Sequence, residues 1–131
     1  LLDDFGEDIH LLKDPTRGGV ATVLNEITRD RNLGVEIVHK HLPIEREVDA
    51  LCEILGLDPL YVANEGIFIA VVDAEVSEKV LEALQKMEHC SNASIIGEVV
   101  ENHPKQVVLT SAIGGKRIVN MLVGEQLPRI C

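Results

Sequence analysis

The last four residues of the chain, Pro128 to Cys131, place a thiol at its end. A terminal thiol contributes little to a core, but it can be carried into another active site, modified there and returned. The α-carboxylate of Cys131 disfavours the thiolate through like charge, and Arg129 offsets part of this effect. Prenylation is excluded because its signal places the cysteine four residues from the end. Cys131 is therefore our first candidate catalytic residue, with an accident of termination as the alternative.

A turn-rich loop over residues 14–19 could bind an anion. Its sequence, Asp-Pro-Thr-Arg-Gly-Gly, precedes a helical pattern. The paired glycines Gly18 and Gly19 would let the backbone approach a ligand beside the free N–H groups of the helix start. Arg17 adds bidentate donors, and Asp14 could coordinate magnesium or orient a water. The loop is not a Walker loop, because no Gly-Lys-Ser/Thr follows. The alternative is a turn in which proline and glycine serve geometry alone.

A second candidate catalytic residue is Glu65, in the polar triplet Asn-Glu-Gly before an apolar run. This placement predicts a carboxylate at the end of a sheet. A carboxylate that is half-desolvated there can act as a general base. The alternative, favoured by the pattern alone, is a solvated glutamate at the start of a strand.

Metal binding is a weaker hypothesis. His39 and His41 alternate, so both could face one side, but no cysteine or carboxylate stands at ligand spacing. Cys52 falls on the apolar stripe of a helical pattern and is expected to be buried, whereas Cys90 lies in a polar loop. Three cysteines without repeated spacing argue against a disulfide framework and for a reducing compartment, so we expect a cytoplasmic protein.

Hydrophobic periodicity predicts the elements that would position these residues. The chain should begin with an acidic, partly helical lead-in over residues 1–13. The run 66–72 is apolar throughout and predicts a central strand covered on both faces. The order of the expected helices and strands indicates an α+β fold with a mixed β-sheet and helices over residues 1–123, followed by a flexible tail over residues 124–131. Helices are expected at 20–29, 45–55 and 75–86, and strands at 35–39, 66–72, 94–100, 106–110 and 116–123, the last three as antiparallel neighbours.

Composition narrows the class of function. The chain has 131 residues, of which 46% are apolar and 26% charged, as in a globular domain. Its net charge of −10 repels nucleic acid and anionic lipid. No apolar run approaches the roughly 20 residues of a membrane span. Because the chain starts without Met inside an acidic stretch, we expect a fragment whose preceding domain has been cut away.

Three motifs together resemble one family. Residues 13–19 (Lys-Asp-Pro-Thr-Arg-Gly-Gly), 63–66 (Ala-Asn-Glu-Gly) and 128–131 (Pro-Arg-Ile-Cys) closely resemble the C-terminal half of the HypE family of hydrogenase maturation proteins. That family belongs to the superfamily of aminoimidazole ribonucleotide synthetase, selenophosphate synthetase and thiamine monophosphate kinase. The resemblance covers the whole chain and implies the fold of the C-terminal domain of aminoimidazole ribonucleotide synthetase-like proteins. The terminal motif is highly specific to HypE.

The resemblance implies a carbamoyl dehydratase. The partner HypF would place a carboxamide on Cys131, and ATP with Mg²⁺ would drive its dehydration to a thiocyanate. The cyano group would pass to iron on the HypC–HypD complex as a cyanide ligand of a [NiFe]-hydrogenase. Glu65 matches the family's acidic residue and would remove the amide protons.

The same resemblance places the glycine loop at the nucleotide. Asp14 would face magnesium, and Arg17 with Gly18 and Gly19 would face phosphate. The family's first domain, which carries most of the ATP site and forms a homodimer, is missing, so this chain alone should not hydrolyse ATP. Two rival hypotheses remain: a superfamily kinase or synthetase acting on a free small molecule, and a non-enzymatic interaction module.

Overall fold

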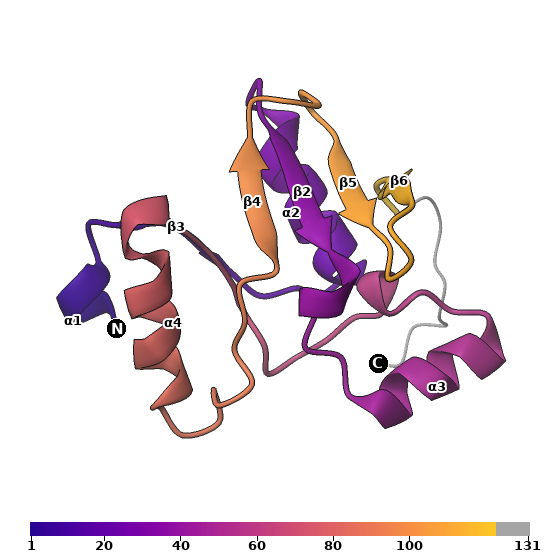
Figure 1. Cartoon of the computed structure of the whole chain (residues 1–131), viewed down its shortest axis with the longest axis horizontal. Coiled ribbons are helices and arrows are strands. Elements are labelled where there is room, and N and C mark those ends of the chain that lie inside the picture. Colours follow the sequence, from indigo (N-terminus) through magenta and orange to yellow (C-terminus); the bar gives the residue numbers. More distant parts are fainter. Residues whose placement is uncertain (123–131) are drawn as a thin grey trace.

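Helices and strands alternate through most of the chain in the computed structural model, which describes residues 1–122 (Figure 1). Short 3₁₀ turns lie at η1 (His39–His41), η2 (Pro59–Tyr61) and η3 (Ala74–Val76). The expected tail, with Cys131, lies outside the described residues. The helices are α1 (Leu2–Phe5), α2 (Gly19–Arg29), α3 (Arg46–Leu55) and α4 (Ser77–Gln85), and the strands are β1 (Ile9–Lys13), β2 (Gly34–Val38), β3 (Ile69–Val72), β4 (Gly97–Val100), β5 (Val107–Thr110) and β6 (Lys116–Ile118).

The larger sheet has four strands in the order β4-β2-β5-β6. Strand β2 pairs antiparallel with β4 and parallel with β5, and β6 pairs antiparallel with β5. The register sets Val35 opposite Val107 and Ile37 opposite Leu109. This arrangement confirms the predicted α+β class with a mixed sheet. It also corrects one detail: β4 and β5 are separated by β2 and are not neighbours, because a local turn pattern does not reveal that an earlier strand inserts between them.

Helix α2 lies behind this sheet and supplies the other half of the core (Figure 1). Its apolar residues recur every three or four positions, so they form one face that must be covered. Side chains from β2 and β5 cover it, with alternate residues of each strand pointing inward. The buried cluster comprises Ala21, Leu24, Val35, Ile37, Leu60, Val107, Leu109 and Val119.

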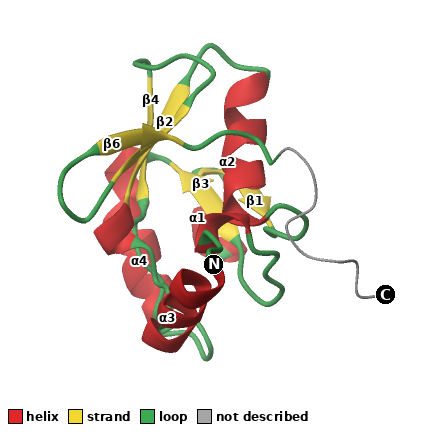
Figure 2. Ribbon diagram, turned by 90° about the vertical axis from the view of Figure 1, so that its right-hand side faces the viewer, coloured by secondary structure: helices red, strands yellow, loops and turns green. Residues whose placement is uncertain are grey.

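The second sheet is a two-stranded ribbon in which β1 pairs antiparallel with β3. Figure 2 shows it apart from the larger sheet. The prediction of a central strand at residues 66–72 was wrong, since β3 begins at Ile69 and, within residues 1–122, pairs only with β1. The apolar side chains of Ile67 and Phe68 are exposed in the loop before it. Strand β1 was not predicted, because its only partner lies far away in the sequence.

Most local predictions were confirmed. Helices α2, α3 and α4 and strands β2, β4 and β5 occupy the predicted segments within a few residues, and Cys52 is buried. Strand β6 is shorter than predicted. His39 and His41 lie in the 3₁₀ turn η1 and not on a strand. Among the described residues, none of the helices is long and apolar enough to cross a membrane.

Candidate functional site

The glycine loop turns the chain from β1 into α2. The Thr16 N–H donates to Asp14 O at 3.0 Å and the Gly19 N–H donates to Thr16 O at 3.2 Å, which closes two consecutive turns. Gly18 has φ 71° and Gly19 has φ 60°, both in the left-handed region that other residues avoid. The predicted loop is therefore confirmed as a tight turn before a helix.

Gly19 is also required by a close backbone contact. A Cβ at this position would lie 2.5 Å from the carbonyl oxygens of both Leu60 and Val62. Both atoms belong to the backbone, so neither can turn aside as a side chain would. The start of α2 thus packs directly on η2 and on the residue that follows it.

We expect Gly19→Ala to destabilise the fold strongly. The substitution combines left-handed strain with two backbone clashes, so the free energy of unfolding should fall by about 3 kcal/mol or more. Gly56→Ala is the matched control: it has φ 67° but no atom within 4 Å of an added Cβ. The control should lose only about 1 kcal/mol. Urea unfolding followed by circular dichroism measures both, and equal losses would contradict the contact described above.

The two predicted loops lie side by side. The Asn64 N–H donates to Pro15 O at 3.1 Å, joining the Asn-Glu-Gly loop to the glycine loop across 49 residues of sequence. Asp14, Arg17 and Glu65 are all exposed. The expected half-desolvated environment of Glu65 is therefore absent in the described part of the chain, because its loop projects outward before β3 begins.

Asp58 and Tyr61, which the sequence analysis missed, hold the second loop in place. The Asp58 carboxylate accepts from the Leu60 N–H at 3.0 Å and pairs with Arg117 of β6. The Tyr61 hydroxyl donates to the Asn120 carbonyl oxygen at 2.9 Å. Asp followed by Pro is a typical cap at the start of a helical turn, so this signal was present in the sequence.

Positive charge at the loops comes from Arg17. Lys13 is engaged with Glu26, whereas Arg17 has no ion-pair partner among residues 1–122. The first turn of α2 adds backbone N–H groups without intrahelical acceptors and carries no acidic side chain. An anion such as a phosphate oxygen would be stabilised here.

The described residues do not form a complete metal site. No group of three or more His, Cys, Asp or Glu that could hold a metal occurs among them. Asp14 is a single carboxylate in the lining of an open, largely apolar pocket of about 460 Å³, together with Leu12 and Phe68. Magnesium commonly takes one or two carboxylates and completes its shell with phosphate oxygens and water, so Asp14 suits one ligand of such an ion.

The end of the described chain passes beside the glycine loop. A Cβ added to Gly18 would lie 3.5 Å from Cδ2 of Leu122. Asn120 is tied to Tyr61, as described above. The described part of the chain therefore ends next to the glycine loop, which is joined to the Asn-Glu-Gly loop.

Comparison with protein families decides the identity of the domain. The model of the family "AIR synthase related protein, C-terminal domain" matches residues 1–110. The chain belongs to this AIR synthase related family. The predicted fold, that of the C-terminal domain of aminoimidazole ribonucleotide synthetase-like proteins, is thereby confirmed.

Among members of the AIR synthase related family, the chain is similar to HypE proteins. It is 48% identical over 124 residues to the carbamoyl dehydratase HypE of Azotobacter vinelandii. The matched region covers 95% of this chain and 36% of that protein. The predicted resemblance to HypE is confirmed. The chain thus spans little more than a third of this relative's length.

Solved structures agree with the sequence comparison. A crystal structure of the hydrogenase maturation protein HypE in complex with ATP matches with a TM-score of 0.86 and 43% identity, covering 95% of this chain and 38% of that one. A crystal structure of a HypE–HypF complex matches with a TM-score of 0.83 and 41% identity, covering 88% and 37%.

Proposed function

We propose that this chain is the C-terminal part of a carbamoyl dehydratase that acts on its own Cys131. The observation that carries the proposal is that Leu122 lies against Gly18, beside the joined glycine and Asn-Glu-Gly loops. The Pro-Arg-Ile-Cys sequence begins only six residues further on. The names of the HypE relatives support the activity.

The proposed reaction removes one water from an S-carboxamide. ATP supplies the phosphoryl group that turns the carboxamide oxygen into a leaving group. One amide proton is lost when ATP phosphorylates the carboxamide oxygen and ADP departs. The second is lost as the carbon–nitrogen triple bond forms and phosphate departs, leaving a thiocyanate on Cys131. Glu65 is the base that we assign to this step, because it is a carboxylate beside the loop that would face phosphate. If another part of the assembled protein covered this exposed loop, water would be removed from the Glu65 carboxylate, which would make it a stronger base.

The glycine loop would stabilise the charge that develops on phosphate. Arg17 and the first turn of α2 present donors at one place, and preorganised donors of this kind lower barriers most where water is excluded. Asp14 would hold magnesium through one carboxylate oxygen. Gly18 and Gly19 keep this backbone free of side chains that would block the approach of a ligand.

The remaining parts of the cycle lie outside this chain. We propose that most of the ATP site, and a homodimer contact, belong to a preceding domain, so that the 131-residue chain alone does not hydrolyse ATP. The HypE–HypF complex among the similar structures supports HypF as the source of the carboxamide. Iron on a HypC–HypD complex would receive the cyano group. A free thiol is maintained in a reducing compartment, which fits a cytoplasmic protein.

The mass of the C-terminal peptide tests the proposal. The chain and a longer protein that includes the preceding domain would be incubated with HypF, carbamoyl phosphate and ATP. We expect a carboxamide on Cys131 in both, followed by loss of one water in the longer protein only. Absence of any modification in the longer protein would sink the proposal, and water loss in the short chain would overturn the inactivity proposed for it.

A further inference from the structure

Helix α3 presents an unusually apolar face to solvent. Cys52 is its one buried residue. Val48, Leu51, Ile54 and Leu55 are 48%, 55%, 81% and 59% exposed, respectively. At 100° per residue these four side chains and Cys52 occupy one continuous side of the helix, whereas Arg46, Asp49 and Glu53 lie on the other. Apolar side chains gathered in this way mark a surface that is covered by another segment or molecule.

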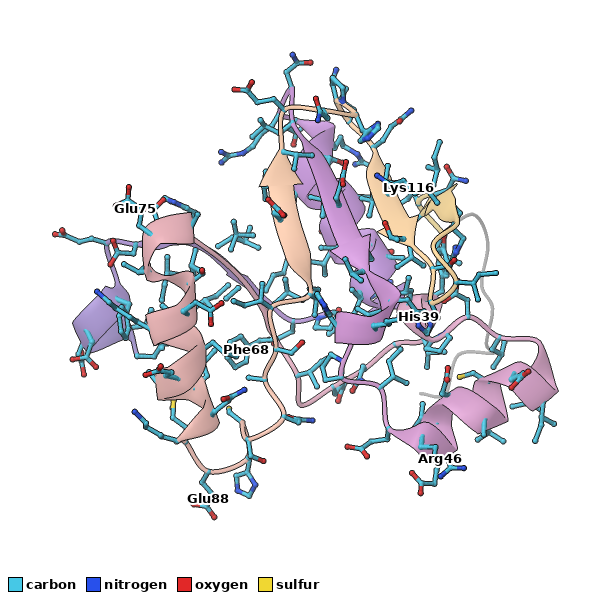
Figure 3. The ribbon with its side chains drawn as sticks, in the orientation of Figure 1. His39, Arg46, Phe68, Glu75, Glu88 and Lys116 are labelled. Carbon is cyan, nitrogen blue, oxygen red and sulfur yellow. The ribbon has the colours of Figure 1, made fainter. Side chains whose placement is uncertain are left out.

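The structure gives α3 little cover of its own. Figure 3 shows the helix, with Arg46 at its start, projecting from the side of the molecule opposite α4. Within residues 1–122 it contacts mainly η2, the turn that follows it in the chain. The four-stranded sheet and α2 bury a different set of residues around Ile37 and Val107. The apolar side of α3 is thus free for an occupant.

We propose that the C-terminal segment, residues 123–131, docks on this side of α3 and covers the Cys131 thiol when no partner holds it. The segment contains the apolar residues Val123, Leu127, Pro128 and Ile130. Its docking is independent of the chemistry proposed above, so either proposal can fail alone.

The place where the described chain ends favours this occupant. Asn120 accepts a hydrogen bond from Tyr61 of η2, and η2 in turn contacts α3. Nine residues follow Leu122. They can reach about 30 Å when extended. Helix α3 is only about 15 Å long at 1.5 Å per residue. The segment can therefore cover the whole helix without any movement of the domain.

One pair of opposite charges is also available to this contact. Glu47 lies within the apolar side of α3, one turn before Leu51, and it has no ion-pair partner among the described residues. Arg129 is the only cationic side chain in residues 123–131. An Arg–carboxylate pair at the edge of an apolar contact fixes the register of the docked segment.

The rate of alkylation of Cys131 by iodoacetamide tests the docking. The 131-residue chain would carry Cys90→Ser, leaving buried Cys52 as an internal control, and the C-terminal peptide would be followed by mass spectrometry. We expect Cys131 to react at least about fivefold more slowly than the same cysteine in a free peptide of residues 123–131, since tethering raises the effective concentration of the segment at α3. Leu51→Ser with Leu55→Ser should restore the peptide rate.

Three further variants make the test specific. Leu127→Ser with Ile130→Ser should raise the alkylation rate of Cys131 to that of a free peptide carrying the same two substitutions. Adding Leu51→Ser and Leu55→Ser to this variant should raise the rate no further. Ile113→Ser removes an apolar side chain that is 97% exposed elsewhere and should leave the rate unchanged. Equal rates in chain and peptide, or slow alkylation that the α3 variants do not change, would overturn the proposal. Protection that rises with protein concentration, together with an α3-dependent dimer in size-exclusion chromatography, would overturn it in favour of a second copy.

Discussion

Cys131→Ser in the longer protein is expected to abolish thiocyanate formation to below detection. A serine hydroxyl stays protonated at neutral pH and is a much weaker nucleophile than a thiol, so it should not accept the carboxamide from HypF. Mass spectrometry of the C-terminal peptide after incubation with HypF, carbamoyl phosphate and ATP measures this loss.

The control for this substitution is Cys90→Ser, which removes a partly exposed thiol from the loop after α4. It should leave both carboxamide and thiocyanate yields unchanged. If turnover of a free small molecule persisted in full after Cys131→Ser, the chain would belong to a superfamily kinase or synthetase instead. The same substitution therefore separates the proposed function from its main enzymatic rival.

Glu65→Gln is expected to slow the reaction one step later, at the dehydration of the carboxamide. Glutamine keeps the size of the side chain but cannot take a proton, and loss of a positioned base commonly costs about 10²–10⁴-fold in rate. HypF should still load Cys131, so the carboxamide should accumulate while its dehydration slows by that factor. A single-turnover time course of the two peptide masses resolves these steps.

Glu88→Gln is the matched control, since Glu88 is a highly exposed carboxylate in the turn after α4 (Figure 3). It should change neither step. Glu65→Asp should recover part of the rate if a carboxylate at this loop is what matters. An unchanged dehydration rate in Glu65→Gln would remove Glu65 from the mechanism, whereas no dehydration in the unsubstituted longer protein would favour the non-enzymatic interaction module.

Local patterns predicted the helices well because each is determined within a few turns of chain. The apolar spacing over residues 20–29 predicted α2, and the predicted end of the next helix at residue 55 is the observed end of α3. The ribbon of β1 and β3 escaped prediction because its two strands are about 60 residues apart in the sequence and neither forms without the other. An apolar run such as residues 66–72 cannot by itself distinguish a central strand from a surface loop that leads into a ribbon.

The candidate site was predicted as separate residues and not as an arrangement. Arg17 and Glu65 were nominated from the chemistry of their types, but the hydrogen bond between Pro15 and Asn64 that joins their loops is a non-local contact. The exposure of Glu65 could not be foreseen either, because burial depends on which segments cover a loop. Cys131 lies outside the described residues, so its role stays a prediction.

The parallel pairing of β2 with β5 makes the two loops inseparable from the rest of the domain. Both loops end before residue 67, yet the strand that completes the core beneath α2 is β5, which lies in the last fifth of the chain. A peptide of the first 67 residues would leave Val35 and Ile37 without partners and would expose an unpaired strand edge, which favours aggregation. Parallel strands joined through so long a connection also form slowly. A minimal version of this site must therefore be designed by grafting the loops onto another scaffold, because trimming the chain from its C-terminal side removes the core first.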